Sequence, residues 1–134
     1  YGAPVIVFDL GTATTVGVVN EDKCFIGGMI IPGVKTSLSA LTTRASQLPT
    51  IKIEKPKHII GRNTIECMQS GIIHGTAAMI DGIISDILPS FGNQPVKIVA
   101  TGGMSKQIMP HCKHEIAVEP HLQFKGIFHA TKES

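Results

Sequence analysis

Residues 7–19, VFDLGTATTVGVV, place a carboxylate, a glycine and three threonines between two apolar runs. Asp9 ends the first run, and Gly11 permits a sharp turn that brings bare backbone close to a ligand. Thr12 and two further threonines add hydroxyl groups beside the exposed amides. Amides in a tight turn form a concavity that binds anions, and a nearby carboxylate suits a cation that accompanies a phosphate. An ordinary hairpin turn explains these residue types equally well.

A second glycine turn lies in residues 96–106, VKIVATGGMSK, which predict a strand, a turn through Gly102 and Gly103, and a helix. Glycines at the carboxyl end of a strand let a flat ligand lie against backbone, and a helix start favours negative charge. Lys106 could contact a phosphate, although lysines are common at helix starts. Neither the P-loop pattern nor the GxGxxG fingerprint occurs. Two such turns in one short chain favour a ligand site over two unrelated turns.

Other polar residues are better explained without a chemical role. Asp81 and Asp86 lie on the flank of a predicted helix, where a solvated face is the simpler explanation. His111, Cys112 and His114 lack the spacing of a zinc site, and no second ligand pair accompanies them. No nucleophile and base are arranged for covalent catalysis.

The composition is that of a globular chain of one domain, with 43% of its 134 residues hydrophobic and 16% charged. The formal net charge is +2 and no two Lys or Arg residues are adjacent, so no nucleic-acid partner is expected.

No apolar run reaches the ~18 residues that span a bilayer, so no membrane anchor is expected. Three cysteines at no disulfide or metal spacing predict reduced thiols in a cytoplasmic protein. The first residues carry no start Met and no signal-peptide pattern, which suggests an internal piece of a longer protein.

The elements around the first glycine turn are expected to form a three-stranded antiparallel meander. Residues 4–10 are almost wholly apolar, residues 14–20 are rich in β-branched side chains, and residues 24–31 follow a polar turn. The remaining pattern predicts helix 34–46, a connection over 47–57, helix 62–88, strand 96–101, helix 105–111, strand 115–118 and helix 121–130. This order predicts an α/β domain in which parallel strands extend the meander into a mixed sheet, with helices on both faces.

The helix predicted over 62–88 carries two stripes. The apolar stripe consists of Ile65, Met68, Ile72, Met79, Ile83 and Ile87, and is widened by Ile73, Ala77, Ile80, Ile84 and Leu88. Asn63 is the expected N-cap, and Glu66 has the position of a capping box. The second stripe consists of small residues, namely Gly71, Gly75, Ala78 and Gly82. Each glycine costs about 1 kcal/mol relative to alanine, so the regular spacing favours close approach of another backbone over a frayed helix.

Four stretches in this order resemble the C-terminal half of a bacterial type III pantothenate kinase. They are YGAP followed by DLGTATT (9–15), GGMIIPG (27–33), IIGRNTIECMQSG (59–71) and ATGG (100–103). The resemblance covers nearly the whole chain. It implies the ribonuclease-H-like fold of the acetate and sugar kinases, actin and the heat-shock chaperone ATPases, in which ATP lies in the cleft between two such halves.

The resemblance also implies roles for individual residues. Asp9 matches the aspartate that binds a monovalent cation, potassium or ammonium. Thr12 matches a contact to the ATP phosphates, with Gly11 beside it, and Mg²⁺ accompanies the nucleotide. The glycines of the second turn, Gly102 and Gly103, match the adenosine motif.

Thr64 matches a contact to pantothenate, which this family binds at a dimer interface. The stripe of small residues on helix 62–88 would then face a second copy of that helix in a homodimer. The family's aspartate-x-glycine-asparagine-threonine phosphate motif is absent from the sequence, as is its Gly-x-Asp-Arg run with the general base. The chain is therefore expected to be one domain, residues 1–134, that forms the C-terminal half of a two-domain kinase and is inactive alone.

The activity implied by the resemblance is ATP-dependent phosphorylation of pantothenate in coenzyme A biosynthesis, in the cytoplasm. This half would supply the adenosine, phosphate and cation site, and the other half would supply the base. Two alternatives remain, namely a non-catalytic actin-like or regulatory module that binds nucleotide, and a kinase of another small alcohol such as a sugar. A pure nucleotide binder does not need Thr64 and its surroundings, which separates the first alternative from the kinase.

Overall fold

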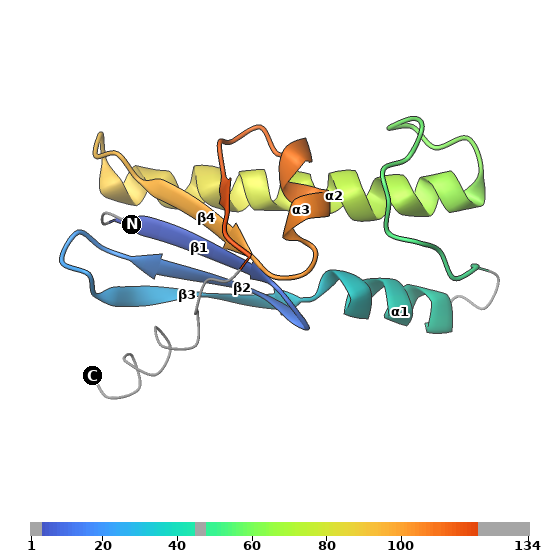
Figure 1. Cartoon of the computed structure of the whole chain (residues 1–134), viewed down its shortest axis with the longest axis horizontal. Coiled ribbons are helices and arrows are strands. Elements are labelled where there is room, and N and C mark those ends of the chain that lie inside the picture. Colours follow the sequence, from blue (N-terminus) through green and yellow to red (C-terminus); the bar gives the residue numbers. More distant parts are fainter. Residues whose placement is uncertain (1–3, 45–47, 121–134) are drawn as a thin grey trace.

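The computed structural model describes residues 4–44 and 48–120, and its first three strands form a meander (Figure 1). Each strand pairs antiparallel with the next, and Asp9 lies opposite Thr15 beside the first turn. The predicted three-stranded antiparallel meander is confirmed. The strands are β1 (Val5–Leu10), β2 (Ala13–Val19) and β3 (Phe25–Pro32).

Two parallel strands extend the meander into a mixed sheet. β4 (Lys97–Thr101) pairs parallel with β1, and β5 (Ala117–Val118) pairs parallel with β4. The strand order is β3-β2-β1-β4-β5. A parallel neighbour requires a long crossover connection, and the helical segment between β3 and β4 supplies it. The predicted mixed sheet is therefore confirmed.

The helices follow the predicted order as far as the structure describes the chain. They are α1 (Val34–Arg44), α2 (Thr64–Ile87), the 3₁₀ turn η1 (Leu88–Phe91), α3 (Ser105–Ile108) and the 3₁₀ turn η2 (Met109–His111). The helix predicted over 105–111 is thus a short α-helix that tightens into a 3₁₀ turn. The helix predicted over 121–130 lies outside the described residues. This helix was expected to help cover the second face of the sheet.

α2 begins two residues later than predicted because Asn63 is its N-cap. The Oδ1 atom of Asn63 accepts the backbone N–H of Glu66 at 2.9 Å, and the backbone of Asn63 is extended. This side chain satisfies one of the amides that a helix start leaves unpaired. The predicted N-cap is confirmed.

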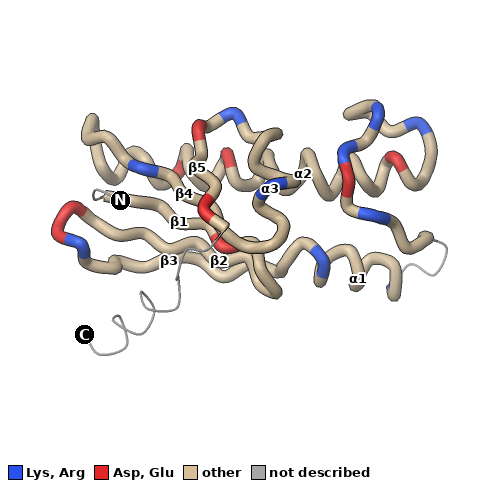
Figure 2. The backbone as a smooth tube through the Cα atoms, viewed as in Figure 1, with Lys and Arg blue, Asp and Glu red and all other residues tan. Residues whose placement is uncertain are grey.

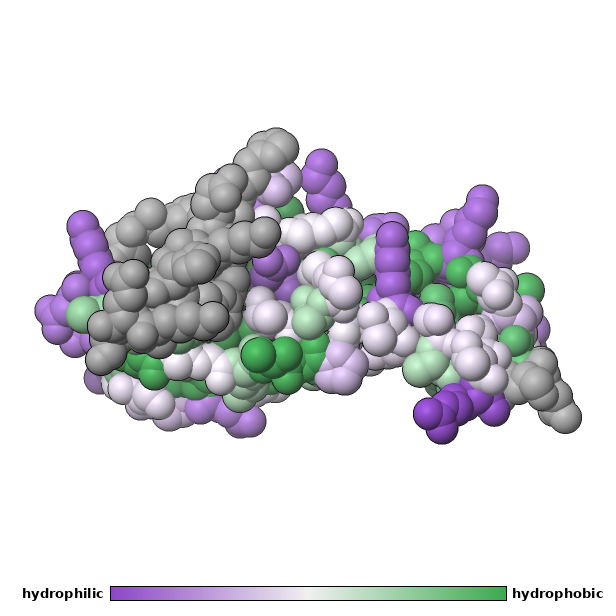
Figure 3. Space-filling view, turned by 90° about the horizontal axis from the view of Figure 1, so that it is seen from below, coloured by the Kyte–Doolittle hydropathy of each residue, from purple (hydrophilic) through white to green (hydrophobic). Residues whose placement is uncertain are grey.

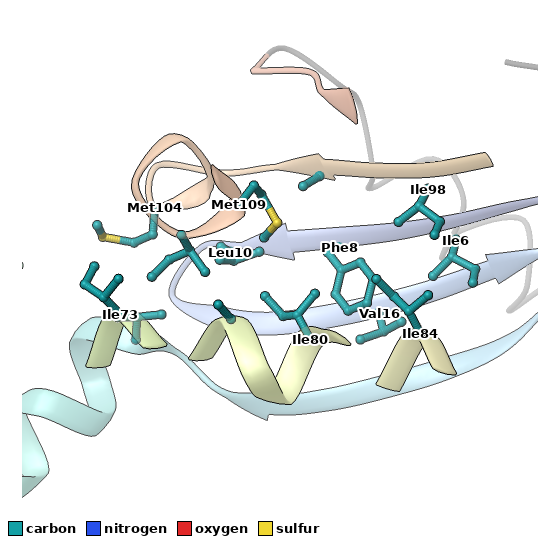
Figure 4. Close-up of a cluster of buried hydrophobic side chains, with 14 residues drawn as sticks. Ile6, Phe8, Leu10, Val16, Ile73, Ile80, Ile84, Ile98, Met104 and Met109 are labelled. Atoms are coloured by element: carbon teal, nitrogen blue, oxygen red, sulfur yellow. The ribbon is translucent and has the colours of Figure 1, made fainter. Parts of the chain in front are cut away.

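The hydrophobic core lies between α2 and one face of the sheet (Figure 4). Alternate residues of each strand point to the same face, so Ile6, Phe8 and Val16 all reach the helix. Isoleucines of α2 point back at them across the layer (Figure 4). The fully buried members of this helix stripe are Ile73, Ile80 and Ile84. Burial of each such side chain contributes about 1.5–3 kcal/mol, which makes this layer the main source of stability.

The centre of the α2 core stripe differs from the predicted one. Four of the five residues expected to widen the contact are buried and Leu88 is partly buried, whereas Ile65 of the expected main stripe is 50% exposed. Met68 is buried, and the other four main-stripe residues pack only partly against the core. The sequence defines a broad apolar arc on α2, and the rotation of the helix about its axis on the sheet decides which part of the arc is central.

The stripe of small residues on α2 points away from the domain. A Cβ atom placed on Gly71, Gly75 or Gly82 would meet no atom within 4 Å. Ala78 is exposed as well. Among the described residues, the stripe therefore contacts no part of its own sheet, and its predicted partner helix stays a prediction.

Large hydrophobic side chains also reach the surface on the side of β3 and α1, where green patches interrupt the hydrophilic surface (Figure 3). Ile26 and Ile30 of β3 are 57% and 78% exposed.

The segment Thr64–Phe91 is long and apolar enough to cross a membrane by length and composition alone. It is weak evidence for a membrane, because the core helix of a globular domain has the same properties, and α2 packs on the sheet.

Candidate functional site

The first glycine turn joins β1 to β2 and presents bare backbone. Gly11 and Thr12 are exposed, whereas Asp9 is partly buried on β1. A Cβ atom on Gly11 would lie 3.4 Å from Asp9 Oδ1, so the carboxylate lies directly against the turn. The turn thus combines accessible amides with a neighbouring carboxylate.

The second glycine turn presses against the end of β1. Gly102 has a φ of +97°, and a Cβ atom there would lie 2.6–2.7 Å from backbone atoms of Leu10. Its carbonyl oxygen accepts the Oγ–H of Ser105 at 2.7 Å, which fixes the start of α3. Only glycine has both the backbone freedom and the absent side chain that this contact requires. The carboxyl ends of β1 and β4 therefore meet at one edge of the sheet, with Asp9 paired to Thr101.

A cavity of about 980 Å³ lies at this edge and joins the two turns. Gly11 and Thr12 line it from the first turn, and Gly103 lines it from the second. The opposite walls come from α1 and from residues 50–54, an irregular stretch before α2. This volume is at the upper end of the range for small-molecule sites, and its place outside the carboxyl ends of the strands is where α/β sheets bind ligands.

The predicted site residues fall into three groups in space. Gly11, Thr12 and Gly103 share the cavity. Asp9 and Gly102 adjoin it without lining it, because Asp9 lies beside the first turn and Gly102 is pressed onto Leu10. Thr64 lies apart, exposed in the first turn of α2.

Sequence reasoning missed the basic and polar residues of the opposite walls. Lys35, Ser39 and Thr42 of α1 and Lys52 of the irregular stretch line the cavity. Figure 2 shows basic residues at the start of α1 and along the connection from α1 to α2. The residues on α1 recur at spacings of four and three, which marks one polar helix face and could have identified that wall. Nothing in the spacing identifies Lys52, because tertiary structure alone brings it to the cavity.

Two side-chain hydrogen bonds hold the irregular wall in place. Gln107 of α3, which also lines the cavity, donates its Nε2–H to the carbonyl oxygen of Ile53 at 3.2 Å. Gln69 of α2 donates to the carboxylate of Glu54 at 3.3 Å. The stretch is thereby attached to two helices, α2 and α3, which hold it as a wall of the cavity.

Asp9 has the environment of a carboxylate that lacks its counter-charge. Burial raises the pKa of Asp9, because removal from water disfavours the ionised form. Within residues 4–44 and 48–120, no ion pair includes Asp9. A cation beside the carboxylate would reverse this shift by favouring the charged form.

The stretch before Thr64 is tightly fastened to α2. His58 Nδ1 lies 2.6 Å from Oε1 of the buried Glu66, and this hydrogen bond is the main reason that the pKa of Glu66 is lowered. Ser70 donates its hydroxyl to the carbonyl oxygen of Ile59. A Cβ atom on Gly61 would lie 2.5 Å from the backbone of α2, so the two segments are in close contact. Thr64 is thus held on a rigid support.

The remaining polar candidates have structural positions. Asp81 accepts the backbone N–H groups of Lys113 and His114 at 2.8 and 3.1 Å. It therefore anchors the turn before β5 and is partly exposed, a structural role that the sequence did not predict. Asp86 is exposed, as expected. Lys106 is exposed on α3 and does not line the cavity.

The cluster of His111, Cys112 and His114 has no metal-binding geometry. Within the part of the chain that the structure describes, no three His, Cys, Asp or Glu side chains are arranged to hold a metal ion. Burial, and then the charge of Asp81, raise the pKa of Cys112 to about 12, so the thiol stays protonated. His111 instead packs its ring edge-on to that of His74, with centroids 5.1 Å apart.

His111 is expected to make the stability of the domain depend on pH. Burial, and then the charges of His74 and Lys55, lower the pKa of His111 below its unfolded value. The unfolded chain then binds more protons near the ordinary histidine pKa of about 6.5, so stability falls as the pH drops through this value.

We expect the free energy of unfolding of His111→Gln to fall less than that of the wild type when the pH is lowered from about 7.5 to 5.5. Urea denaturation at several pH values measures this, with His114→Gln as the matched substitution, and parallel curves for His111→Gln and wild type would contradict it.

Comparison with known proteins places the chain in a family. Residues 1–86 match the family described as Type III pantothenate kinase, and this match includes Asp9, Gly11, Thr12 and Thr64. The glycine pair of the second turn lies beyond the matched residues.

Two solved structures share the fold. One is a Campylobacter jejuni protein described as a conserved putative Baf family transcriptional activator, which is 19% identical to this chain with a TM-score of 0.58. The alignment covers 97% of this chain and 56% of the Campylobacter jejuni protein. The other is the ethanolamine utilization protein EutJ from Carboxydothermus hydrogenoformans, which is 21% identical to this chain with a TM-score of 0.52. The alignment covers 88% of this chain and 44% of the EutJ chain. The chain thus spans about half the length of these structures.

The predicted fold class, a ribonuclease-H-like domain of the actin-like ATPase type, is confirmed by the mixed sheet and these structural neighbours. The family match covers well over half of the chain. This chain belongs to the type III pantothenate kinase family.

Proposed function

We propose that this chain is the nucleotide-binding part of a cytoplasmic, ATP-dependent kinase that phosphorylates pantothenate in coenzyme A biosynthesis. The observation that carries the proposal is the cavity in which the turns of Gly11–Thr12 and Gly103 face the lysines of the opposite walls. Phosphoryl transfer depends mainly on positioning and on neutralisation of phosphate charge. Bare turns and basic side chains around one cavity are suited to both tasks.

The cavity fits a nucleotide in its chemistry as well as its size. Gly11 and Thr12, which we term the phosphate loop, would hold the phosphates through backbone amides and the threonine hydroxyl. Lys35 and Lys52 would oppose their charge, and Mg²⁺ would enter with the nucleotide. A Cβ atom on Gly103 would meet no atom of the described residues within 4 Å, so on that side this backbone would accommodate a flat adenosine group.

Asp9 would hold the monovalent cation next to the phosphate loop. The carboxylate lies against Gly11, is partly buried, and has a raised pKa. A potassium or ammonium ion would favour its ionised form and add a positive charge close to the phosphates. Asp9 thus fits a cation that serves ATP binding.

Thr64 would contact pantothenate at an interface between two copies of the chain. It does not line the nucleotide cavity, so a second surface must complete its site. The open stripe of small residues lies on the same helix and begins at Gly71, about two turns after Thr64. A homodimer through α2 would therefore bring a second copy close to Thr64.

The dimer proposal predicts the effect of a leucine in the stripe. Gly75→Leu should abolish the dimer by overpacking, at a cost of about 1–3 kcal/mol or more, while the folded subunit keeps its stability. Nothing lies within 4 Å of the new Cβ, and leucine favours a helix by up to about 1 kcal/mol over glycine. Analytical ultracentrifugation measures the result, with Thr76→Leu, about 100° around the helix, as the control. An unchanged dimer in Gly75→Leu would rule out this interface.

The general base would come from a part of the protein outside this chain. The chain spans about half the length of the solved structures that share its fold, and a second domain outside this chain would close the nucleotide cavity and carry the base. We therefore expect the 134-residue chain alone to bind ATP weakly and to transfer no phosphoryl group.

An activity and binding panel tests the proposal. The full-length protein is assayed with ATP and pantothenate, and with sugars in its place, while thermal shift reports which compounds bind the native state. Turnover with pantothenate and not with sugars is the expected result. Turnover with a sugar alone would support a kinase of another alcohol, and ATP binding without turnover would support a non-catalytic module.

A further inference from the structure

The GGMIIPG stretch, which spans the end of β3 and the residue before α1, contains two glycines at which no side chain fits. A Cβ atom on Gly28 would lie 1.7 Å from the carbonyl oxygen of Val16 in β2. A Cβ atom on Gly33 would lie 2.0 Å from the carbonyl oxygen of Thr12 and 3.0 Å from that of Gly11. Real Cβ atoms essentially never approach other atoms within 3.0 Å, so both glycines are required by contact. At Gly33 the contacted backbone is the phosphate loop itself.

α1 begins at this contact and adds a hydrogen bond to the same carbonyl group. Thr36 donates its Oγ1–H to the carbonyl oxygen of Thr12 at 3.3 Å. The backbone N–H of Ser37 donates to the carbonyl oxygen of Gly33 at 2.9 Å, which closes the first helical turn over the loop. Two independent contacts from one short segment therefore hold the Thr12 carbonyl.

We propose that Gly33 and Thr36 are positioning residues that orient the phosphate loop for the phosphates of ATP. This inference rests on the proposed nucleotide site. An anion site made of backbone amides works only while the carbonyl groups of the same turn point away from the anion. Rotation of the Thr12–Ala13 peptide would turn a carbonyl oxygen towards the phosphates, and the contacts with α1 oppose that rotation. The GGMIIPG motif thus couples the end of β3 to the geometry of the neighbouring turn.

A purely structural role of Thr36 makes a different prediction from a positioning role. If Thr36 only stabilised the fold, its loss would affect all ligands of the native state alike, through the folded fraction. If it orients the phosphate loop, its loss weakens the binding of ligands with phosphates and spares adenosine.

The experiment compares ATP, ADP and adenosine binding to the full-length protein by calorimetry. Thr36→Val keeps the shape of the side chain and removes the donor, and Thr36→Ser keeps the hydroxyl. Thr43→Val is the matched control, because Thr43 is exposed on α1 outside the nucleotide cavity. We expect Thr36→Val to bind ATP and ADP roughly two- to tenfold more weakly, as the loss of one hydrogen bond predicts. Adenosine binding should not change, Thr36→Ser should restore ATP binding, and the KM for pantothenate should stay constant.

Two outcomes would overturn the inference. One is ATP binding to Thr36→Val at the wild-type level, and the other is an equal loss for ATP and adenosine. Wild-type protein that binds no ATP would reject the proposed nucleotide site together with this inference. Wild-type protein that binds ATP without phosphorylating pantothenate would reject the proposed reaction only, and the contrast between Thr36→Val and wild type would still decide the inference.

Discussion

Replacement of Gly102 by alanine is expected to lower the free energy of unfolding of the domain by about 2–6 kcal/mol. The new Cβ atom would lie 2.6–2.7 Å from the backbone of Leu10, at a φ of +97° that alanine avoids. Strained backbone costs about 1–3 kcal/mol and overpacking typically costs another 1–3 kcal/mol. This loss is large against the 5–15 kcal/mol that typically stabilises a domain, and it would nearly unfold one at the lower end of that range. Urea denaturation measures the loss.

Gly103→Ala is the matched control for Gly102→Ala. A Cβ atom on Gly103 would meet nothing within 4 Å, so its stability should stay within about 0.5 kcal/mol of the wild type. Because Gly103 lines the nucleotide cavity, Gly103→Ala should still weaken adenosine binding. Equal stability of the two variants would show that the contact between the second turn and Leu10 is not what Gly102 provides.

If Asp9 holds the proposed cation, replacement of Asp9 by asparagine is expected to lower kcat/KM of the full-length protein about 10²-fold and to remove the proposed dependence of this activity on potassium. Asparagine keeps the size of the side chain and removes the charge that would hold the cation. Loss of one hydrogen-bond donor to the developing charge of a transition state typically costs 10²–10³-fold, and loss of a residue that supports a metal ligand costs 10–100-fold, so a loss of about 10²-fold is expected for a cation ligand. Titration of activity with potassium chloride, against sodium chloride at the same ionic strength, measures the effect.

The pKa of Asp9 separates this loss from misfolding. Burial raises the pKa of Asp9 in the folded state above its unfolded value, so ionisation of Asp9 destabilises the fold as the pH rises through these values. Asparagine cannot ionise, and Asp9→Asn should therefore be at least as stable as the wild type at neutral pH without potassium. Asp22→Asn, an exposed carboxylate in the turn before β3, is the control. An Asp9→Asn enzyme with the wild-type potassium response would exclude Asp9 as the cation ligand.

Local patterns in the sequence were sufficient for most of the elements. Short turns between β-branched runs predicted the meander, since neighbouring antiparallel strands need only a few residues to connect them. Asn63 and Glu66 predicted the start of α2, because an N-cap bond joins residues three apart. The two glycine turns were visible as exceptions to their apolar surroundings, and both lie at the cavity edge.

Contacts between distant segments could not be predicted in the same way. The rotation of α2 that buries Ile73 in preference to Ile65 depends on the surface of the sheet beneath it. Asp81 lies on a polar flank of the helix, and only the path of the chain before β5 gives it two amides to accept. Each of these outcomes depends on a partner more than 25 residues away or on the opposite layer.

The sequence by itself determined the order of the elements, the family and the two turns with the residue types for an anion site, because these depend on neighbours within a few residues. Only the tertiary structure decided that Lys52 shares a cavity with Gly11, and that Gln107 holds one wall of this cavity in place. It also decided that Gly33 contacts the carbonyl group of Thr12 at the start of α1. The physical reason is that packing brings together atoms whose separation along the chain leaves no periodic trace. A glycine reveals that something passes close by, and the folded chain alone determines which backbone it is.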